Sequence, residues 1–249
     1  TPQTLQAIEH SSDLVGYGLY LDLLGDLCAK KQHHALALGQ EIERARLALN
    51  LAAEGKTTTL LSSGDVGIYA MASVVFELLD QHLQGKESPE QTEWLSIDIE
   101  VIAGISAMQA ASSRVGAMLG HDFCTISLSD LLTPWQTIEK RVQSAGAGDF
   151  VIAFYNPVSR KRDWQLNAAR DMLLRYRPAS TPVVLGRQLT RADEQITLTT
   201  LGELDAKDVD MFTLVAVGNC ETQQIQYLNP VTDQAQTWVY TPRGYQQKL

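Results

Sequence analysis

The chain has 249 residues, of which 45% are hydrophobic and 20% are charged, values typical of a folded globular protein rather than a disordered or fibrous one. Its formal charge of −9 argues against long-range attraction to nucleic acid or to an anionic membrane surface. Cys28, Cys124 and Cys220 form neither a CxxC pair nor an even disulfide set, so we expect a cytoplasmic protein.

The first half of the chain contains two strand-turn-helix patterns. Apolar residues at helical spacing predict a helix over 41–53, which ends at Gly55. A strand over 57–61, a small polar turn and a helix over 68–83 follow; the polar turn interrupts the longest apolar stretch, so we expect no transmembrane span. A strand over 97–102, a turn at Gly104 and a helix over 107–118 repeat the unit, which predicts parallel pairing.

The second half alternates strands and helices less regularly. Helices are predicted over 135–144 and 161–176, and strands over 123–128, 150–154, 182–187, 195–199, 213–217 and 237–241. Several of these strands lack crossover helices between them, which favours a mixed sheet. We therefore expect an α/β protein with two domains, residues 1–120 around a mostly parallel sheet and residues 121–249 around a mixed sheet.

Two glycine turns follow the strands of the first half. Gly64 and Gly67 allow a ligand to approach the main chain, and Asp65 can accept hydrogen bonds from an ammonium or ribose hydroxyl. A helix cap is an equally good interpretation of Asp65, and it is the commoner one for Ser106 in the second turn. Because the turns occupy successive units, we expect them to converge on one crevice.

Two nucleotide-binding motifs are excluded. No GxGxxG occurs in the sequence. Residues 50–57, NLAAEGKT, imitate a P-loop, but Asn50 replaces the first glycine and the predicted helix precedes the strand. The sequence therefore does not predict an NTPase.

Five segments carry a family resemblance. They are SSGDVGIYAMA (62–72), IAGISAMQAASSRVGAMLGHDF (102–123), ISLSDLLTPW (126–135), FYNPVSRKRDWQL (154–166) and VYTPRGY (239–245). Together they resemble the precorrin-3B C(17)-methyltransferases, also called cobalt-factor III methyltransferases, within the tetrapyrrole methylase family. The GD and GI[ST]A turns belong to the wider family, whereas SLSDLLTPW, YNP with its basic run, and TPRGY are typical of the C(17) branch.

The resemblance implies a two-domain homodimer with S-adenosylmethionine in the cleft between the domains. The cofactor contacts carried over to this chain are Gly64, Asp65, Ile68, Ser106, Ala107, Tyr155, Asn156 and Leu189. The family's GxGPG loop normally stands just upstream of a TPQTL-like segment, and the printed sequence begins at that segment. The uroporphyrinogen branch has an acidic residue where this chain has Gly18, so the role of that acid does not transfer.

The implied reaction methylates C(17) of a corrin precursor in cobalamin biosynthesis and contracts the ring. A sulfonium methyl group is already electrophilic, so transfer needs alignment and exclusion of water but no metal. Contraction needs an acid or base. The candidates are His121, Asp122, Asp130, Tyr69 and Glu41; we favour His121 for its pKa near neutrality, although a histidine bonded to the main chain is the commoner case.

The substrate of such an enzyme carries several carboxylates. Basic residues that follow strand ends are candidate clamps, namely Arg160, Lys161, Arg162, Arg187 and Arg191, although a solvated helical turn also explains the first three. Trp135, Trp164, Tyr155 and Phe123 offer flat apolar surface to a macrocycle or belong to the core.

Three other functions remain open. A methyltransferase of the same fold can act on another corrin position, or on RNA or protein, although the charge of −9 argues against RNA. A non-catalytic cofactor-binding module is the alternative from another class. The sequence does not decide whether the substrate contains cobalt.

Overall fold

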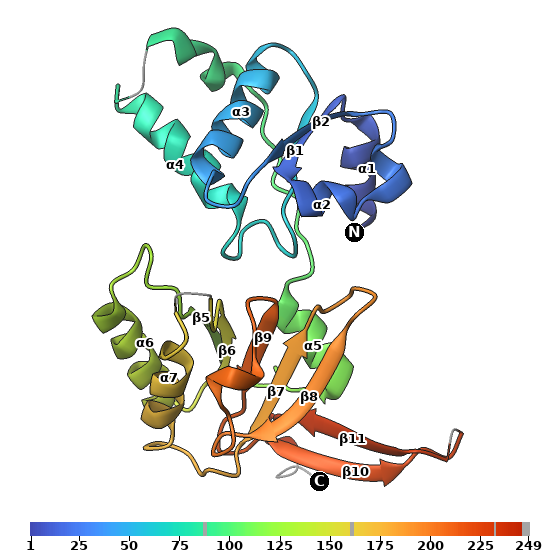
Figure 1. The fold of residues 1–249 in the computed structure, drawn as a ribbon, viewed down its shortest axis with the longest axis vertical. Coiled ribbons are helices and arrows are strands. Elements are labelled where there is room, and N and C mark those ends of the chain that lie inside the picture. The colour runs from blue at the N-terminus through green and yellow to red at the C-terminus, as the bar shows by residue number, and fades with distance from the viewer. Residues whose placement is uncertain (87–88, 160–161, 232, 246–249) are drawn as a thin grey trace. The chain divides into compact units, whose positions relative to one another are not determined.

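The computed structural model describes residues 1–86, 89–159, 162–231 and 233–245 (Figure 1). The chain divides into two compact units, Thr1–Ser106 and Ala107–Leu249. This division precedes helix α5 (Ala107–Val115), whereas the domain boundary expected from the sequence follows that helix. The expected α/β class, with one parallel and one mixed sheet, is confirmed.

In the described part of the first unit, three parallel strands form a sheet in the order β2-β1-β3. The strands are β1 (Asp13–Tyr17), β2 (Gln32–Leu36) and β3 (Thr58–Leu60). The longer helices are α1 (Pro2–His10), α3 (Glu41–Ala53) and α4 (Met71–Leu83); shorter ones are α2 (Gly18–Asp22), η1 (Gly25–Cys28) and η2 (Pro89–Ser96). Helix α3 has the predicted bounds, and α4 begins later than predicted, at Met71.

The central strand β1 places its side chains in two apolar clusters. Leu14 packs with Ile8 of α1 and with Leu21, whereas Val15 packs with Ala48 and other residues of α3. Successive residues of a strand point to opposite faces, so helices cover both faces of the sheet. Leu14 and Val15 are fully buried, which makes β1 the centre of the unit's core.

The strand predicted over 97–102 is not formed, so this prediction was wrong. The segment pairs with no described strand, and Ile99 and Val101 remain exposed. Gln3 donates to Glu100 in this segment at 2.5 Å, and beyond the segment the backbone N–H of Gly104 donates to Asp65. The apolar residues of this segment predicted a strand, but the segment does not bury one face against the rest of the unit.

In the described part of the second unit, five strands form a mixed sheet in the order β5-β6-β9-β7-β8. They are β5 (Phe123–Ser127), β6 (Val151–Tyr155), β7 (Pro182–Arg187), β8 (Gln195–Thr200) and β9 (Thr213–Val217). Only the β5–β6 pair is parallel, and the other pairs are antiparallel. A short helix, η3 (Ala206–Asp208), connects β8 to β9.

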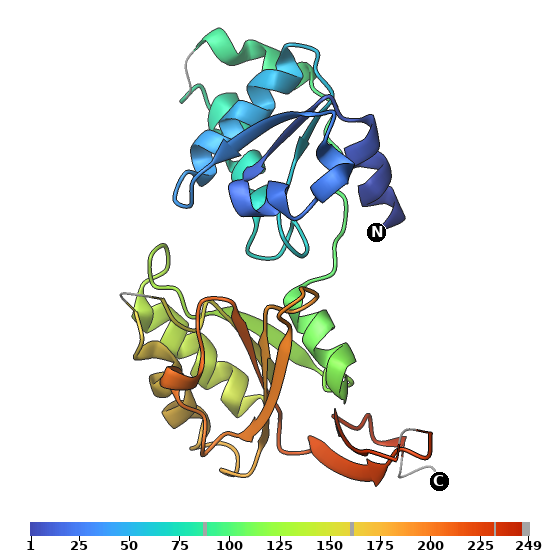
Figure 2. The same ribbon diagram turned by 45° about the vertical axis from the view of Figure 1, so that its right-hand side comes forward.

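Helices cover both faces of this sheet (Figure 2). On one face, α6 (Trp135–Ala147) and α7 (Gln165–Leu173) pack through Ile138 and Leu166 onto Val183 and its neighbours. On the other face, α5 packs through Val115 onto Val184. Helix α7 is shorter than the helix predicted over 161–176, and residue 161 of that segment lies outside the described residues.

A small second sheet follows α5, in the order β10-β11-β4. Its strands are β4 (Gly116–Ala117), β10 (Gln223–Leu228) and β11 (Ala235–Tyr240). Helix α5 ends at Val115 instead of continuing to Met118, because the chain enters β4 through Gly116 with a φ of 127°. Within the residues that the structure describes, no helix is long and apolar enough to cross a membrane.

Candidate functional site

The two glycine turns of the first unit meet at Asp65. Its Oδ1 accepts a hydrogen bond from Gly67 N at 2.8 Å, and its Oδ2 accepts one from Gly104 N at 3.0 Å. The convergence expected from the sequence is therefore observed, and one carboxylate links the two turns. Helix α4 begins only at Met71, so Asp65 stabilises the turn rather than the helix end. Each oxygen keeps a further lone pair for a ligand donor.

The main chains of the two turns approach closely because they carry glycine. A Cβ on Gly104 would overlap the carbonyl oxygen of Gly64. Gly64 itself has a left-handed φ of 79°, and a Cβ there would lie 3.6 Å from the Cα of Ser106, which is buried. Ile68 is half-buried and its N–H donates to the carbonyl of Asp65 at 3.2 Å, and Tyr69 has a φ of 52°. The region presents peptide groups at a surface without intervening side chains.

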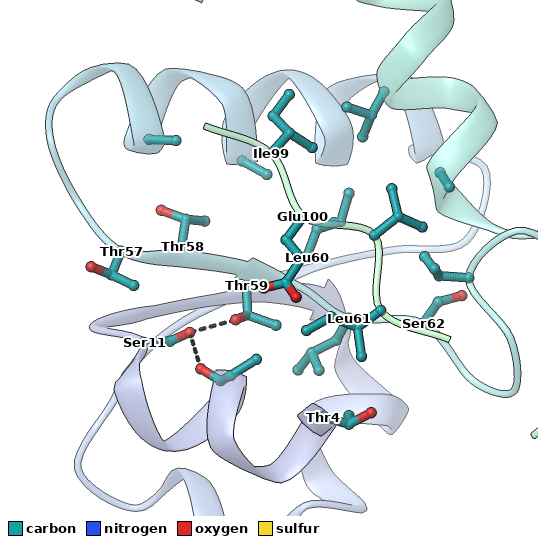
Figure 3. A pocket seen from close by; sticks show the side chains of 18 of the residues that line it. Thr4, Ser11, Thr57, Thr58, Thr59, Leu60, Leu61, Ser62, Ile99 and Glu100 are labelled. Carbon is teal, nitrogen blue, oxygen red and sulfur yellow. Dashed lines mark hydrogen bonds between the residues drawn. The ribbon is translucent and has the colours of Figure 1, made fainter. Parts of the chain in front are cut away.

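A cavity of about 660 Å³ extends from these turns along strand β3 (Figure 3). Its walls are β3, residues 97–102 and faces of α1, α3 and α4, with Gly64 and Gly104 among the lining residues. Ser11 donates to the carbonyl of Ala7 at 2.8 Å and is hydrogen-bonded to Thr59, so these hydroxyls are engaged (Figure 3). The lining combines apolar side chains and hydroxyls with polar groups that include the carboxylates of Asp98 and Glu100, as is typical of a small-molecule pocket that holds a few polar groups.

Tyr155 joins the end of strand β6 to the start of helix α5. Its phenolic oxygen accepts a hydrogen bond from Met108 N at 3.2 Å. Met108 is in the first turn of α5, where N–H groups have no partner within the helix. The structure thus places Tyr155 near Ala107, the first residue of the same helix.

Asn156 follows Tyr155 in a left-handed conformation with a φ of 50°. Its side-chain amide donates to Ser127 Oγ at 3.0 Å, at the end of the neighbouring strand β5. Its carbonyl accepts a hydrogen bond from Arg162 Nη1 at 2.7 Å. The loops after β5 and β6 are therefore connected through Asn156.

Arg162 is a buried part of this connection. Only 8% of the residue is exposed, and Nη1 also donates to the carbonyl of Leu128 at 3.0 Å. Its Nε lies 3.7 Å from Asp130, and burial lowers the pKa of the guanidinium. This geometry corrects the expectation that Arg162 is an exposed substrate clamp. Arg160 and Lys161, the other two members of that run, lie outside the described residues.

Arg187 and Arg191 lie at and beyond the carboxyl end of strand β7. Arg187 Nε donates to Asp210 at 2.7 Å, and Arg191 Nη1 donates to Gln188 at 2.8 Å. Leu189 lies between them and is half-buried. The structure therefore groups three of the predicted site residues in one loop of the second unit.

His121 lies at the opposite edge of the same sheet. It precedes β5, whereas Tyr155 and Asn156 follow the carboxyl end of the parallel strand β6. Its Nδ1 accepts a hydrogen bond from Asp122 N at 2.7 Å. These contacts favour a local structural role over a catalytic one.

The aromatic candidates separate by exposure. Trp135 and Trp164 form an edge-to-face pair with centroids 4.7 Å apart; Trp135 packs against the core, whereas Trp164 is half-exposed. Leu132, in the loop after β5, is 98% exposed. Phe123 begins β5 and is at the edge with His121. Trp164 and Leu132 thus offer apolar surface, while Trp135 supports it.

Three residues of this region were not predicted from the sequence. Ser127 positions Asn156, while Glu194 and Arg114 form an ion pair at 2.5 Å beside Leu189. The polar residue at the end of β5, in the SLSD segment, is a signal that points to Ser127. The partners in the ion pair are too far apart in sequence for any local pattern to connect them.

Comparison with known proteins gives consistent matches along the chain. Residues 1–205 match the sequence model of the tetrapyrrole (corrin/porphyrin) methylases. The chain is 41% identical over 245 residues to the precorrin-3B C(17)-methyltransferase of Sinorhizobium sp, covering 98% of this chain and 91% of the relative. It is 42% identical to the probable cobalt-factor III C(17)-methyltransferase of Salmonella typhimurium, covering 98% and 93%.

Solved structures agree with these matches. The methyltransferase CobJ superposes with a TM-score of 0.84 at 36% identity, covering 97% of this chain and 93% of that one. The uroporphyrin-III C-methyltransferase of Thermus thermophilus, solved with S-adenosylhomocysteine, shares the fold with a TM-score of 0.60 at 18% identity, covering 88% and 90%.

Proposed function

Because the chain belongs to the tetrapyrrole (corrin/porphyrin) methylases, we propose that it methylates C(17) of precorrin-3B or its cobalt counterpart and contracts the ring. The observation that carries this proposal is 41–42% identity, over 98% of the chain, to two relatives named for methylation at C(17). The methyl donor is S-adenosylmethionine, and the pathway is cobalamin biosynthesis.

The residues of the two glycine turns suit this donor. Close main-chain approach at Gly64 and Gly104 leaves peptide groups accessible, and Asp65 has lone pairs for hydroxyl or ammonium donors. We assign cofactor contact to Gly64, Asp65, Ile68 and Ser106 in the first unit and to Ala107, Tyr155, Asn156 and Leu189 in the second.

The chain contributes orientation to the chemistry. When bound, S-adenosylmethionine supplies an electrophilic methyl group, so the protein has to align the ring carbon and exclude water. Tyr155 and Asn156 are themselves fixed by Met108 and Ser127, which keeps the end of β6 in one geometry. Fixed groups of this kind lower the entropic cost of alignment.

The macrocycle requires both apolar and cationic surface. The exposed Trp164 and Leu132 follow the carboxyl ends of β6 and β5 and suit a flat apolar ring. Arg187 and Arg191 suit its carboxylates, because guanidinium groups pair with carboxylates through two hydrogen bonds. Arg187 remains partly exposed beside Asp210 and can exchange that partner for a substrate group. The acid or base for contraction is not among these assignments.

The test is an anaerobic incubation of the full-length protein with S-adenosylmethionine and either precorrin-3B or cobalt-precorrin-3. We expect the mass to rise by one methyl group and the absorbance spectrum to shift for one of the two substrates, which also identifies the pathway. Cofactor binding with no methylated product from either substrate would refute the C(17) assignment. Homodimerisation and a cytoplasmic location stay predictions, and size-exclusion chromatography with light scattering tests the first.

A further inference from the structure

One carboxylate connects the loop between strands β7 and β8 to helix α5. Glu194 Oε2 accepts a hydrogen bond from Thr190 N at 2.6 Å, and Glu194 Oε1 accepts one from Arg114 Nε at 2.5 Å. Arg114 belongs to helix α5, so Glu194 connects the loop to a separate element of the second unit. The two acceptors of a single side chain are thereby both engaged.

The backbone of residues 188–190, to which Glu194 is hydrogen-bonded, is strained. Gln188 and Thr190 have φ values of 50° and 66°, in the left-handed region that non-glycine residues rarely adopt. Leu189 lies between them, and its side chain occupies the space that a Cβ on Gly186 would need. Such conformations persist only where surrounding contacts enforce them. The hydrogen bond from Thr190 to Glu194 is one of those contacts.

The other end of the connection leads to a second proposed cofactor contact. Arg114 is two helical turns after Ala107 and therefore lies on the same side of α5. The first turn of that helix is bonded to Tyr155 through Met108 N. Glu194 and Arg114 thus link the Leu189 loop to the helix that begins with Ala107.

We propose that Glu194 and Arg114 are positioning residues for the methyl donor, holding the Leu189 main chain in register with the start of helix α5. The inference rests on the proposed function, because it concerns the same cofactor. Neither side chain is assigned direct contact with the reacting groups. Both act through the loop and the helix that they connect.

Exposure and charge are compatible with this role. The side chain of Glu194 is 22% exposed and that of Arg114 is 45% exposed, so the pair is partly shielded from solvent. The hydrogen bond from Arg114, followed by that from Thr190 N, lowers the pKa of Glu194. The carboxylate is therefore charged over the neutral range.

The main experiment measures S-adenosylhomocysteine affinity of Glu194→Ala in the full-length protein by calorimetry. Loss of both hydrogen bonds detaches the loop from helix α5 and removes the contact at Thr190, and we expect the Kd to rise about tenfold. In steady-state assays the KM for S-adenosylmethionine should rise, while the KM for the macrocycle stays near its wild-type value. A purely structural role would not produce this difference between the two substrates.

The matched control is Asp205→Ala. Asp205 also accepts a backbone hydrogen bond, from Lys207 N at 3.0 Å, and pairs with Lys207 Nζ at 3.1 Å. It follows β8 near the amino end of β7, because Thr200 pairs with Pro182, and is therefore at the opposite edge from Leu189. We expect wild-type affinity from this variant.

Two variants of Arg114 distinguish the contribution of the Arg114–Glu194 ion pair from that of the hydrogen bond between Thr190 N and Glu194. Arg114→Met removes the charge but keeps a long side chain, and the hydrogen bond from Thr190 N to Glu194 remains. We therefore expect a smaller rise in Kd than for Glu194→Ala. Arg114→Lys restores the charge and should return the Kd toward the wild-type value. Thermal melts of all variants report folding independently of ligand.

The outcomes are distinguishable. Wild-type affinity in a folded Glu194→Ala variant, or an equal loss in Asp205→Ala, would overturn the positioning role and leave the proposed function standing. Failure of the wild-type protein to bind S-adenosylhomocysteine would instead overturn the proposed function, and the inference with it.

Discussion

At the scale of single residues, Asp65 combines a structural role with a proposed role in cofactor binding. Its carboxylate connects Gly67 N and Gly104 N, and its remaining lone pairs are the proposed acceptors for the cofactor. Removing the carboxylate therefore affects both the shape of the turns and the binding of the ligand. Keeping one acceptor oxygen preserves part of the shape.

We predict that Asp65→Ala raises the Kd for S-adenosylhomocysteine more than tenfold, because loss of hydrogen bonds to a charged group costs about 1.5–3 kcal/mol. Asp65→Asn should give an intermediate Kd, since its amide oxygen still accepts from one N–H group. Calorimetry measures both values. The exposed Asp26→Ala in η1, which does not line the cavity, is the control, and equal affinities in Asp65→Ala and the wild type would exclude Asp65 from the site.

Gly104 is the second residue at which we predict the effect of a substitution, because an added Cβ there would clash with the backbone. A methyl group there would overlap the carbonyl oxygen of Gly64, and backbone cannot move aside as a flexible side chain can. We predict that Gly104→Ala lowers the free energy of unfolding by about 1–3 kcal/mol, a typical cost of overpacking. Urea unfolding measures this change. Gly18→Ala, where the nearest neighbouring atom is 4.0 Å away, should be close to neutral, and similar values for the two variants would contradict the prediction.

At the scale of elements, the first two parallel strands are linked by a buried charged group. Asp13 of β1 accepts hydrogen bonds from His34 of β2 at 2.8 Å and from Ser12 at 2.7 Å. The bond from His34, then that from Ser12, lowers the pKa of Asp13. A carboxyl with a lower pKa in the folded state contributes stability above its unfolded pKa of about 4 and loses it as the pH falls through the folded pKa.

We therefore predict that the Asp13→Asn variant is less stable than the wild type at pH 6 and that the difference shrinks as the pH is lowered to 3. Between the folded and unfolded pKa the unfolded state binds more protons, so wild-type stability rises with pH in that window. Urea unfolding along a pH series provides the measurement. A difference that stays constant down to pH 3 would mean that ionisation of Asp13 does not stabilise the sheet.

The elements differ in how well the sequence predicted them. Strands β7 and β9 have the predicted bounds, and both are mostly apolar runs that are buried. Strands β1, β2 and β10 were not predicted: β2 (QHHAL) and β10 (QQIQYL) are mostly polar and exposed, whereas β1 (DLVGY) is buried, so burial alone does not decide which strands the sequence reveals. Residues 97–102 show the reverse case, in which an alternating pattern forms no ladder.

In the candidate site, residues in local turns were predicted from the sequence, whereas residues whose roles depend on contacts with distant segments were not. Gly64, Asp65 and Gly104 stand in turns directly after apolar segments, and this local pattern led to the prediction of a ligand site there, whereas Asn156 was predicted from the family resemblance. Glu194, Arg114 and Ser127 were missed because their roles depend on contacts between distant segments. Arg162 was assigned to the substrate because it belongs to a basic run after a strand, and the sequence gives no sign that it is buried between two loops.

At the scale of the whole molecule, the net charge of −9 opposes a polycarboxylate substrate. Raising the salt concentration from about 10 to about 150 mM shortens the screening length from about 30 to about 8 Å and weakens this repulsion. We predict that the KM for the macrocycle falls over this range, as measured by steady-state kinetics at constant pH. A KM that rises with salt would show instead that the local arginines dominate the encounter.

The left-handed residues near the proposed cofactor contacts matter for protein engineering. Among the described residues, Tyr69, Asn156, Gln188 and Thr190 combine a side chain with positive φ and stand within a few positions of those contacts. Glycine at Tyr69, Gln188 or Thr190 would relieve about 1–2 kcal/mol of backbone strain, whereas at Asn156 it would remove the bond to Ser127. Selection for heat resistance alone would favour such replacements, and the resulting catalysts would tolerate higher temperatures while holding their methyl donor less well.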